Sequence, residues 1–337
     1  MLSWIRRQEN CWMPVKRQKD WRSMDFNHTP VLFEECMDGL RIKEGGIYAD
    51  GTLGGGGHAA GIASRIGPEG TLIGIDRDQD ALDAAEKHLA GYPCRKIFAH
   101  CTYTRIRDVL EEHRIPGLDG AILDIGVSSF QLDNAGRGFS YMNDAPLDMR
   151  MNRDDDFSAY DVVNGYDRDE LAWIIRTYGE ERWASRIADF IVKQRAEAPI
   201  KTTGELTELI KAAIPASARR EGPHPAKRTF QAIRIEVNSE LDQLKEAVDE
   251  YCDLLLPEGR LCIITFHSLE DRIVKEAFGA RLDPCTCPKD LPMCICGKKP
   301  DVRKVTGKPI TAKEEELERN PRARSAKLRI IEKRRSR

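Results

Sequence analysis

The sequence lacks long apolar runs, an excess of one charge, and a disulfide framework. No apolar stretch approaches the roughly 20 residues that cross a bilayer, so we expect no membrane partner. The formal net charge of the 337 residues is −2, so binding to a nucleic acid would require a local basic surface. Ten cysteines do not make a disulfide scaffold in a chain this long and indicate a reducing cytoplasm. The composition, 41% hydrophobic and 32% charged, predicts a globular protein of one large or two ordinary domains.

Residues 1–23 also lack the apolar segment of a secretory signal. They carry several basic residues and three tryptophans, Trp4, Trp12 and Trp21. We expect a disordered extension, or an upstream start chosen over Met24; a transit peptide is the alternative. Because the segment has no convincing amphipathic pattern, a bacterial cytoplasm is favoured over a mitochondrion.

The most informative feature is a glycine-rich loop between two short apolar runs that each end in an acid. Ile47–Asp50 leads into Gly51–Gly57, a helical pattern follows over Ala59–Ile66, and Leu72–Asp76 closes the unit. Glycines let the backbone approach a ligand, and an acid that ends the second strand can hydrogen-bond ribose hydroxyls. The pattern therefore predicts a βαβ nucleotide site. The alternative is a glycine-rich turn with an unrelated acid downstream.

The kind of nucleotide depends on Asp50. Gly55, Gly57 and Ala60 formally match the dinucleotide fingerprint Gly-x-Gly-x-x-Ala. However, a pyrophosphate at a helix N-terminus requires N–H donors, and a carboxylate just before the loop would repel it. An acid at this position suits a cationic ligand such as S-adenosylmethionine, whose sulfonium and amino groups are positive. We therefore favour a methyl donor over NAD.

Alternating strands and helices predict an α/β fold with a doubly wound parallel sheet. Strand candidates end at Asp50, Asp76, His100 and Asp124, and another apolar run covers residues 260–266. The gap before this last run is too long for one crossover helix, and residues 157–218 have mostly helical patterns. We predict a discontinuous sheet domain, residues 24–135 and 219–337. A helical domain, residues 136–218, would be inserted into it over the ligand crevice.

Asp124 ends the fourth predicted strand and is the candidate catalytic residue. In a doubly wound sheet it would lie beside the glycine loop, where donor and acceptor meet. A carboxylate there could accept a hydrogen bond from an amine that attacks a methyl group, a reaction that depends mainly on alignment. The alternative is that Asp124 only caps the following helix.

The motifs taken in order resemble the MraW/RsmH family of bacterial methyltransferases, over roughly residues 27–331. They are Asp50-Gly51-Thr52, Gly56-Gly57-His58, Asp124-Ile125-Gly126-Val127-Ser128-Ser129, Arg137-Gly138-Phe139-Ser140, Pro146-Leu147-Asp148-Met149-Arg150-Met151, Tyr178-Gly179-Glu180-Glu181, Arg228-Thr229-Phe230-Gln231-Ala232, Phe266-His267-Ser268-Leu269-Glu270-Asp271-Arg272 and Asn320-Pro321-Arg322-Ala323-Arg324-Ser325. The resemblance implies a class I, Rossmann-like methyltransferase domain with an inserted substrate-recognition domain. It also implies transfer from S-adenosylmethionine to N4 of a cytidine in the decoding region of 16S rRNA, in the small ribosomal subunit.

The resemblance also implies the residues that hold the donor. They are Gly55, Gly56, Gly57 and His58 at the loop, Asp76 at the ribose, Tyr103 by the adenine, and Asp124 and Gln131 completing the pocket. Many amino-methylating enzymes carry an Asp/Asn-Pro-Pro-aromatic motif. This chain has Asp124-Ile125-Gly126-Val127 instead, so the group that accepts the N4 proton stays open.

Candidate RNA contacts follow from aromatic and basic residues near the same motifs. Aromatic side chains often stack on unstacked bases, and basic side chains hold phosphates. We predict contacts from Phe139, Arg228, His267, Arg322 and Arg324. For Phe139 the alternative is packing between the domains, and for His267 it is a structural role. For the last few residues of the basic segment 321–337, a solvated tail is the alternative.

Four cysteines are spaced in two close pairs, Cys285-x-Cys287 and Cys294-x-Cys296. Four thiols in so short a loop could hold a structural zinc ion, although Cys-x2-Cys pairs are commoner. A reduced loop without metal is the alternative.

Two other functions remain open at this stage. One is an RNA-binding assembly factor that keeps the fold but has lost transfer, and the other is an NAD-dependent oxidoreductase. A homodimer is compatible with the sequence, but nothing in it requires one.

Overall fold

The computed structural model describes residues 30–220, 222, 224–288 and 293–335. The expected extension, residues 1–23, lies outside them. Among the described residues, no helix is both long and apolar enough to cross a bilayer.

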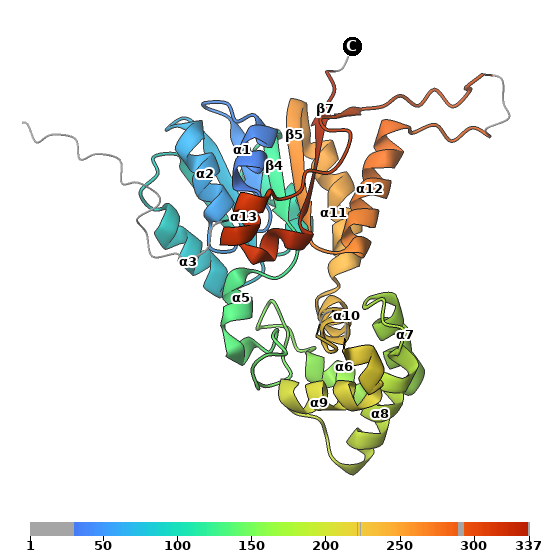
Figure 1. The fold of residues 1–337 in the computed structure, drawn as a ribbon. Coiled ribbons are helices and arrows are strands. Elements are labelled where there is room, and N and C mark those ends of the chain that lie inside the picture. The colour runs from blue at the N-terminus through green and yellow to red at the C-terminus, as the bar shows by residue number, and fades with distance from the viewer. Residues whose placement is uncertain (1–29, 221, 223, 289–292, 336–337) are drawn as a thin grey trace, which may run out of the picture.

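A seven-stranded sheet forms the body of the molecule (Figure 1), in the order β3-β2-β1-β4-β5-β7-β6. The strands are β1 (Ile47–Asp50), β2 (Thr71–Asp76), β3 (Arg95–His100), β4 (Leu118–Asp124), β5 (Leu255–Thr265), β6 (Val302–Lys304) and β7 (Lys327–Lys333). β1 to β5 pair in parallel, whereas β7 is antiparallel to β5 and to β6. The predicted strand ends at Asp50, Asp76, His100 and Asp124 are confirmed.

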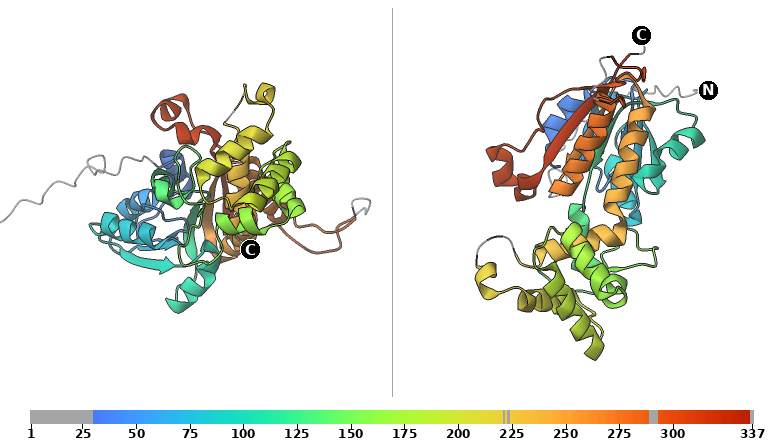
Figure 2. Two further views of the ribbon diagram at one scale, coloured as in Figure 1. Left: turned by 90° about the horizontal axis from the view of Figure 1, so that it is seen from below. Right: turned by 90° about the vertical axis from the view of Figure 1, so that its right-hand side faces the viewer.

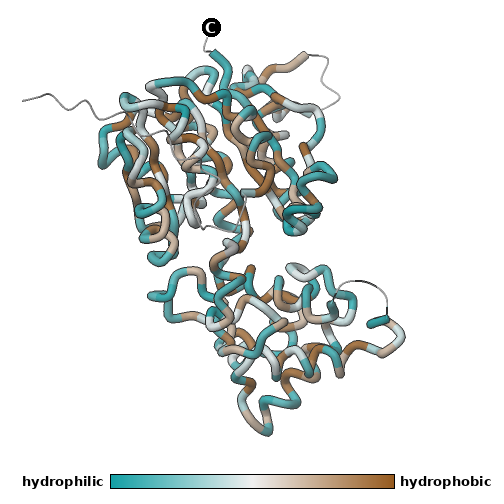
Figure 3. The backbone as a smooth tube through the Cα atoms, turned by 60° about the vertical axis from the view of Figure 1, so that its left-hand side comes forward, coloured by the Kyte–Doolittle hydropathy of each residue, from teal (hydrophilic) through white to brown (hydrophobic). Residues whose placement is uncertain are grey.

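Helices cover both faces of the sheet because the central strands are apolar on both faces. Neighbouring residues such as Leu72 and Ile73 are fully buried in different clusters, one on each face. One face is covered by α1 (Phe33–Leu40), α2 (Gly57–Ile66) and α3 (Gln79–Leu89), and the other by α4 (Ile106–Glu112), α11 (Glu240–Leu254) and α12 (Ser268–Leu282). Figure 3 shows the apolar strands between more polar helices. The predicted α/β class is confirmed.

The basic C-terminal segment contains a strand, β7, that the sequence did not predict. Leu328, Ile330 and Ile331 of β7 are buried against β5. Glu332 is also buried and binds Arg260 at 2.9 Å. The lysines and arginines of this segment concealed the strand pattern in the sequence. Their long side chains extend out of the core, while the apolar residues between them fill it.

A separate helical unit lies at the carboxyl end of the parallel strands (Figures 1 and 2). It follows α5 (Ser129–Asp133) and contains α6 (Ala159–Gly165), α7 (Arg168–Thr177), α8 (Ala184–Glu197), α9 (Thr203–Ala213) and α10 (Lys227–Asn238). Thr202 caps α9 by accepting a hydrogen bond from the Glu205 N–H at 3.2 Å. The Glu205 side chain in turn accepts a hydrogen bond from the Thr202 N–H, which completes a capping box.

The helical unit extends beyond the boundary expected at residue 218. Phe230 and Ile233 of α10 are buried in the helical core, and α10 packs against α6 and α7. Residues 219–238 were assigned to the sheet domain from sequence, but α10 belongs with the insertion. The amphipathic pattern of α10 shows that one face is buried, but it does not show whether that face packs on the sheet or on the helical core.

A buried ion pair joins the helical unit to the sheet. Arg137 Nη1 lies 2.9 Å from Asp78 Oδ2, and both side chains are at most 2% exposed. Arg137 Nη2 donates to the carbonyls of Arg150 and Met151. Asn238, at the end of α10, accepts a hydrogen bond from the Met151 N–H at 2.8 Å. The segment around Met151 is therefore fixed from both sides.

We expect Arg137→Met to lower the free energy of unfolding by about 3–5 kcal/mol, because Asp78 would stay buried without its cation. The measurement is urea unfolding followed by circular dichroism. The matched control is Arg168→Met, since Arg168 pairs with Asp189 at side-chain exposures of 43% and 56%. That change should cost less than about 1 kcal/mol. Equal losses in the two variants would contradict a special role for the buried pair.

Candidate active site

Three aspartates stand side by side at the carboxyl edge of the sheet. Asp76, Asp50 and Asp124 end β2, β1 and β4, which are neighbours in the sheet. The order of the strands reverses between β1 and β4, and ligands of open α/β sheets bind at such a switch point. The structure therefore brings together the three acids singled out from the sequence.

The glycine loop is held against this edge by hydrogen bonds. The Gly54 N–H donates to Asp76 Oδ2 at 2.8 Å, and His88 Nδ1 lies 2.8 Å from the Gly55 carbonyl. Gly56 has φ 78°, a left-handed conformation that favours glycine, and directly precedes α2. Asp76 Oδ1 accepts a hydrogen bond from the Asp78 N–H. A carboxylate has about four acceptor positions, so Asp76 can hold the loop and still receive ribose hydroxyls.

Burial raises the pKa values of the aspartates at this edge. The pKa of Asp50 rises to about 7, and that of Asp124 rises to about 8, with the negative charges of Asp50 and Glu270 adding to the effect of burial. Burial also raises the pKa of Asp76. Asp124 Oδ1 is buried without a hydrogen-bond partner among the described residues. Ionising these groups together is unfavourable unless a positive charge comes close.

His58 does not supply that positive charge. It is buried at the start of α2, with Nε2 3.0 Å from the Val31 carbonyl and Nδ1 3.8 Å from Asp124 Oδ2. Burial lowers its pKa to about 4, so the imidazole is neutral near pH 7. A ligand that carries its own positive charge fits this site, and a pyrophosphate does not.

Two other residues expected at the donor have partners within the protein. Gln131 is buried, and its Nε2 donates to Asp78 Oδ2 at 2.9 Å while its Oε1 accepts from the Ser128 N–H. Its amide therefore positions Asp78 and the start of α5. Tyr103 follows β3 in the short helix η2 (Tyr103–Arg105), and its ring packs against the core on the α11 face.

His267 has the structural role that was its alternative. It caps the N-terminus of α12, where its Nδ1 accepts a hydrogen bond from the Glu270 N–H at 3.4 Å. Its Nε2 lies 2.8 Å from Oε1 of Glu270, whose side chain is fully buried. The Phe266 N–H donates to the other Glu270 oxygen. This cap fixes the turn after β5, beside Asp124.

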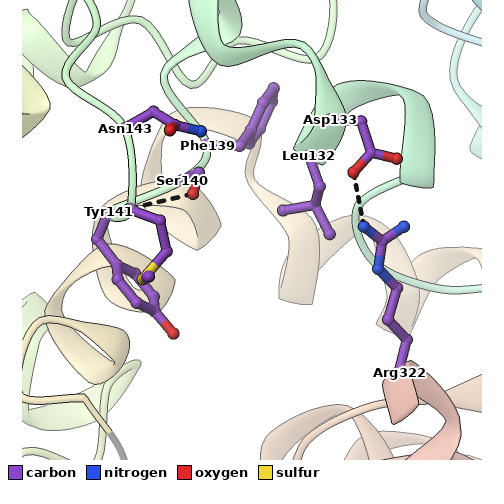
Figure 4. Close-up of a pocket in the computed structure, with 8 residues that line it drawn as sticks. Leu132, Asp133, Phe139, Ser140, Tyr141, Asn143 and Arg322 are labelled. Carbon is purple, nitrogen blue, oxygen red and sulfur yellow. Dashed lines mark hydrogen bonds and ion pairs between the residues drawn. The ribbon is translucent and has the colours of Figure 1, made fainter. Parts of the chain in front are cut away.

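A pocket of about 470 Å³ lies between α5, residues 139–143 and Arg322 (Figure 4). Phe139 lines it, although the ring is only 7% exposed and packs into the helical core. Tyr141, also at the pocket, stacks on His224 with ring centroids 4.5 Å apart. Arg322 reaches in from η5 (Pro321–Ser325) and pairs with Asp133 at 2.7 Å. The pocket thus combines aromatic faces with a cation.

The remaining predicted residues lie apart from this pocket's lining. Arg324 is exposed on η5. Arg228 is exposed on α10 and donates to the Glu180 carbonyl at 3.1 Å. The four cysteines do come together, with their sulfur atoms within 4.8 Å of one another. Their loop follows α12 and projects from the sheet, away from the helical unit (Figure 1).

Sequence reasoning gave no role to Asp78 or Arg137, although both support the site. Asp78 caps α3 and binds Gln131 and Arg137. An acid two residues beyond a strand end is common, so its position alone carries no signal. Arg137 stood within a recognised motif, Arg137-Gly138-Phe139-Ser140, but only the fold reveals that it is buried.

The sheet order, the antiparallel seventh strand and the acids around the glycine loop define a class of protein. The chain has the fold of the Rossmann-like, S-adenosylmethionine-dependent methyltransferases. Residues 25–334 match the MraW methylase family, and the chain belongs to that family.

The chain is also similar to proteins that carry names. The chain is 56% identical over 310 residues to the ribosomal RNA small subunit methyltransferase H of Clostridium botulinum (strain Loch Maree / Type A3), which covers 92% of this chain and 100% of that protein. Two solved structures are similar at 11% identity. A candidate rRNA methylase from Clostridium thermocellum has a TM-score of 0.44, with 90% of this chain and 98% of that chain covered. An rRNA methylase from Streptococcus thermophilus has a TM-score of 0.42, with 89% and 95% covered.

The acid cluster predicts a pH-dependent preference for S-adenosylmethionine over S-adenosylhomocysteine, which lacks the sulfonium charge. As pH rises through the pKa values of Asp50 and Asp124, about 7 and about 8, each carboxyl loses a proton and attracts the sulfonium more strongly. The dissociation constant of S-adenosylhomocysteine divided by that of S-adenosylmethionine should therefore increase from pH ~6 to ~9.

Isothermal titration calorimetry measures this ratio. Both ligands carry the same amino group, so its titration cancels in the comparison. Asp124→Asn should flatten the upper part of the pH profile, whereas Asp154→Asn, at an exposed position, should not. A ratio that does not change with pH in the unsubstituted protein would contradict the electrostatic assignment.

Proposed function

We propose that this protein transfers the methyl group of S-adenosylmethionine to N4 of a cytidine in 16S rRNA of the small ribosomal subunit. Membership of the MraW methylase family supports the methyl transfer. The name of the relative from Clostridium botulinum supports small-subunit rRNA as the acceptor. The observation that carries the proposal is the acid cluster at the switch point, where Asp50 is buried, Asp124 is partly buried and the pKa values of both are raised. Such a cluster suits a cationic methyl donor.

Each residue at the edge has a separate task in this reaction. The donor, when bound, supplies an electrophilic methyl group on a sulfonium. Asp76 and the glycine loop would hold the nucleoside part of the donor, and Asp50 would attract its positive end. Burial strengthens the attraction between a carboxylate and a cation, because little water screens it.

Asp124 is the proposed proton acceptor. With the donor bound, its sulfonium would supply the methyl group for N4 and would leave as an uncharged thioether. N4 then carries a positive charge and must lose a proton. The unpartnered Oδ1 of Asp124 can accept a hydrogen bond from N4–H and take that proton. Alignment of the reacting atoms supplies most of the rate.

The pocket between Phe139 and Arg322 is the proposed entry for an unstacked cytosine. Tyr141 offers an aromatic face, Asn143 offers amide hydrogen bonds, and Arg322 can bind a phosphate. α5 lines the pocket and follows Asp124 after a short loop, so the pocket is close in the chain to the proposed proton acceptor. Arg228 and Arg324 would contact the RNA outside the pocket.

An assembly factor without transfer activity is the competing function. It would bind the same RNA, but it would not need the acids. Asp50, Asp76 and Asp124 are all present and lie at adjacent strand ends, which favours the enzyme.

The test incubates the protein with methyl-labelled S-adenosylmethionine and small subunits that lack the modification. The RNA is then digested, and the labelled nucleosides are identified by mass spectrometry. We expect label in N4-methylcytidine. Donor binding without any labelled nucleoside would support the assembly factor, and label on another atom would correct the acceptor.

Asp124→Asn should lower kcat by about 100-fold or more, because the amide cannot accept the proton. Asp124→Ala should have a similar effect. Circular dichroism checks that both variants are folded, and Asp154→Asn serves as an exposed control. Retention of full activity in the Asn variant would remove Asp124 from the mechanism.

Arg322→Met should raise KM for the ribosomal subunit about tenfold, a change of about 1.4 kcal/mol in binding. The affinity for S-adenosylmethionine should stay unchanged, because Arg322 belongs to the acceptor pocket. Arg319→Met is the matched control, since Arg319 is an exposed arginine that precedes η5. An equal effect of both variants would indicate general charge attraction instead of a contact at the pocket.

We further propose that the protein acts in the bacterial cytoplasm, where small subunits are assembled. The cysteines of the described part are all free, which suits a reducing compartment. A homodimer stays a prediction.

A further inference from the structure

The loop between α12 and β6 brings four thiols together without a core around them. The loop covers residues 283–301 and contains both Cys-x-Cys pairs. Met293 and Ile295, beside the second pair, are 77% and 79% exposed. Burial of apolar side chains therefore does not explain why these sulfurs converge.

The distances between the sulfurs match those around a tetrahedral metal. Cys294 Sγ lies 3.5 Å from Cys285 Sγ, 3.8 Å from Cys287 Sγ and 3.4 Å from Cys296 Sγ, and the sulfurs of Cys285 and Cys296 are 3.9 Å apart. Zinc–sulfur bonds of about 2.3 Å place the corners of a tetrahedron about 3.8 Å apart. A disulfide would need about 2.05 Å. The arrangement therefore has the dimensions of a tetrathiolate site.

The backbone around the sulfurs directs a hydrogen-bond donor at one of them. The Ile295 N–H donates to Cys287 Sγ at 3.3 Å. Gly297 makes the second turn possible, with φ 67° in the left-handed region. Such N–H groups stabilise the negative charge that metal-bound thiolates carry.

We propose that Cys285, Cys287, Cys294 and Cys296 bind one zinc ion as a structural site. Four thiols release four protons to solvent as Zn²⁺ binds, with no change of oxidation state. The resulting net charge of −2 is near the exposed Lys298 and Lys299. All four coordination positions are protein sulfurs, so no position is open for catalysis.

The zinc ion would fix the connection between α12 and the edge strand β6. No other described element lies between Leu282 and Val302. The loop projects away from the helical unit (Figure 1), so this site is independent of the proposed methyl transfer.

The test measures metal directly on the full chain. Protein purified without chelators should contain about one zinc ion per chain, as measured by inductively coupled plasma mass spectrometry. The double variant Cys285→Ser/Cys296→Ser should contain at most about a tenth of that amount, because two of four ligands are lost. Cys94→Ala is the matched control, since Cys94 is a buried thiol outside the loop, and its zinc content should equal that of the unsubstituted chain.

A second measurement covers loss of metal during purification. The metal-stripped, reduced chain is titrated with Co²⁺, and the thiolate-to-cobalt absorption should saturate at about one equivalent. The double variant should lack this absorption. Absence of metal uptake by the unsubstituted chain in both measurements would overturn the proposal, as would equal uptake by the double variant.

Discussion

The buried pair between Arg137 and Asp78 is the interaction on which the rest of the architecture depends. Asp78 lies two residues beyond Asp76, and its N–H donates to the Asp76 carboxylate. The same short turn therefore orients the acid at the proposed ribose position and anchors the helical unit. A shift of the helical unit would also move Asp76, because Asp78 contacts both Arg137 of the helical unit and the Asp76 carboxylate.

This pair is stable because most of its hydrogen-bonding capacity is used. Asp78 binds Gln131 and Arg137 and caps α3, and Arg137 also binds two carbonyls of the insertion. Removing one partner of such a network costs more than the pair contributes, since the other charge remains buried. The Gln131 side chain belongs to this network, and its expected contact with the donor stays a prediction.

The strand ends at the carboxyl edge of the sheet could be predicted from the sequence, because they depend on local patterns. Short apolar runs placed four strand ends correctly, three of them at acids, and glycines marked the loop after the first strand. Tertiary choices were harder. β7 was missed because basic residues surround its three buried aliphatic residues, and α10 was placed with the wrong core because any amphipathic helix can cover either one.

The roles of individual polar residues show the same limit. His267 is a plausible RNA contact in the sequence, yet the fold makes it the cap of α12. Arg137 looks like any loop arginine until its complete burial is known. Burial decides whether a polar residue faces a ligand or the protein, and burial depends on segments far apart in the chain. Burial is also the largest cause of the raised pKa values of Asp50 and Asp124, so these values could not be predicted from the sequence.

The insertion also has a consequence for how the chain folds during synthesis. The buried residues of the helical core, as far as the structure describes them, lie between Phe139 and Ile233, so this core can form once α10 has left the ribosome. The sheet must wait for β5 and then β7, the last strand to emerge. Until β5 emerges, one edge of β4 has no partner strand, and until β7 emerges the outer edge of β5 has none. Unpaired edges invite aggregation. The inserted helical unit can therefore fold before the sheet that contains the N-terminal strands. A nascent chain that stalls before residue 327 has an incomplete sheet, and the sheet carries the proposed active site.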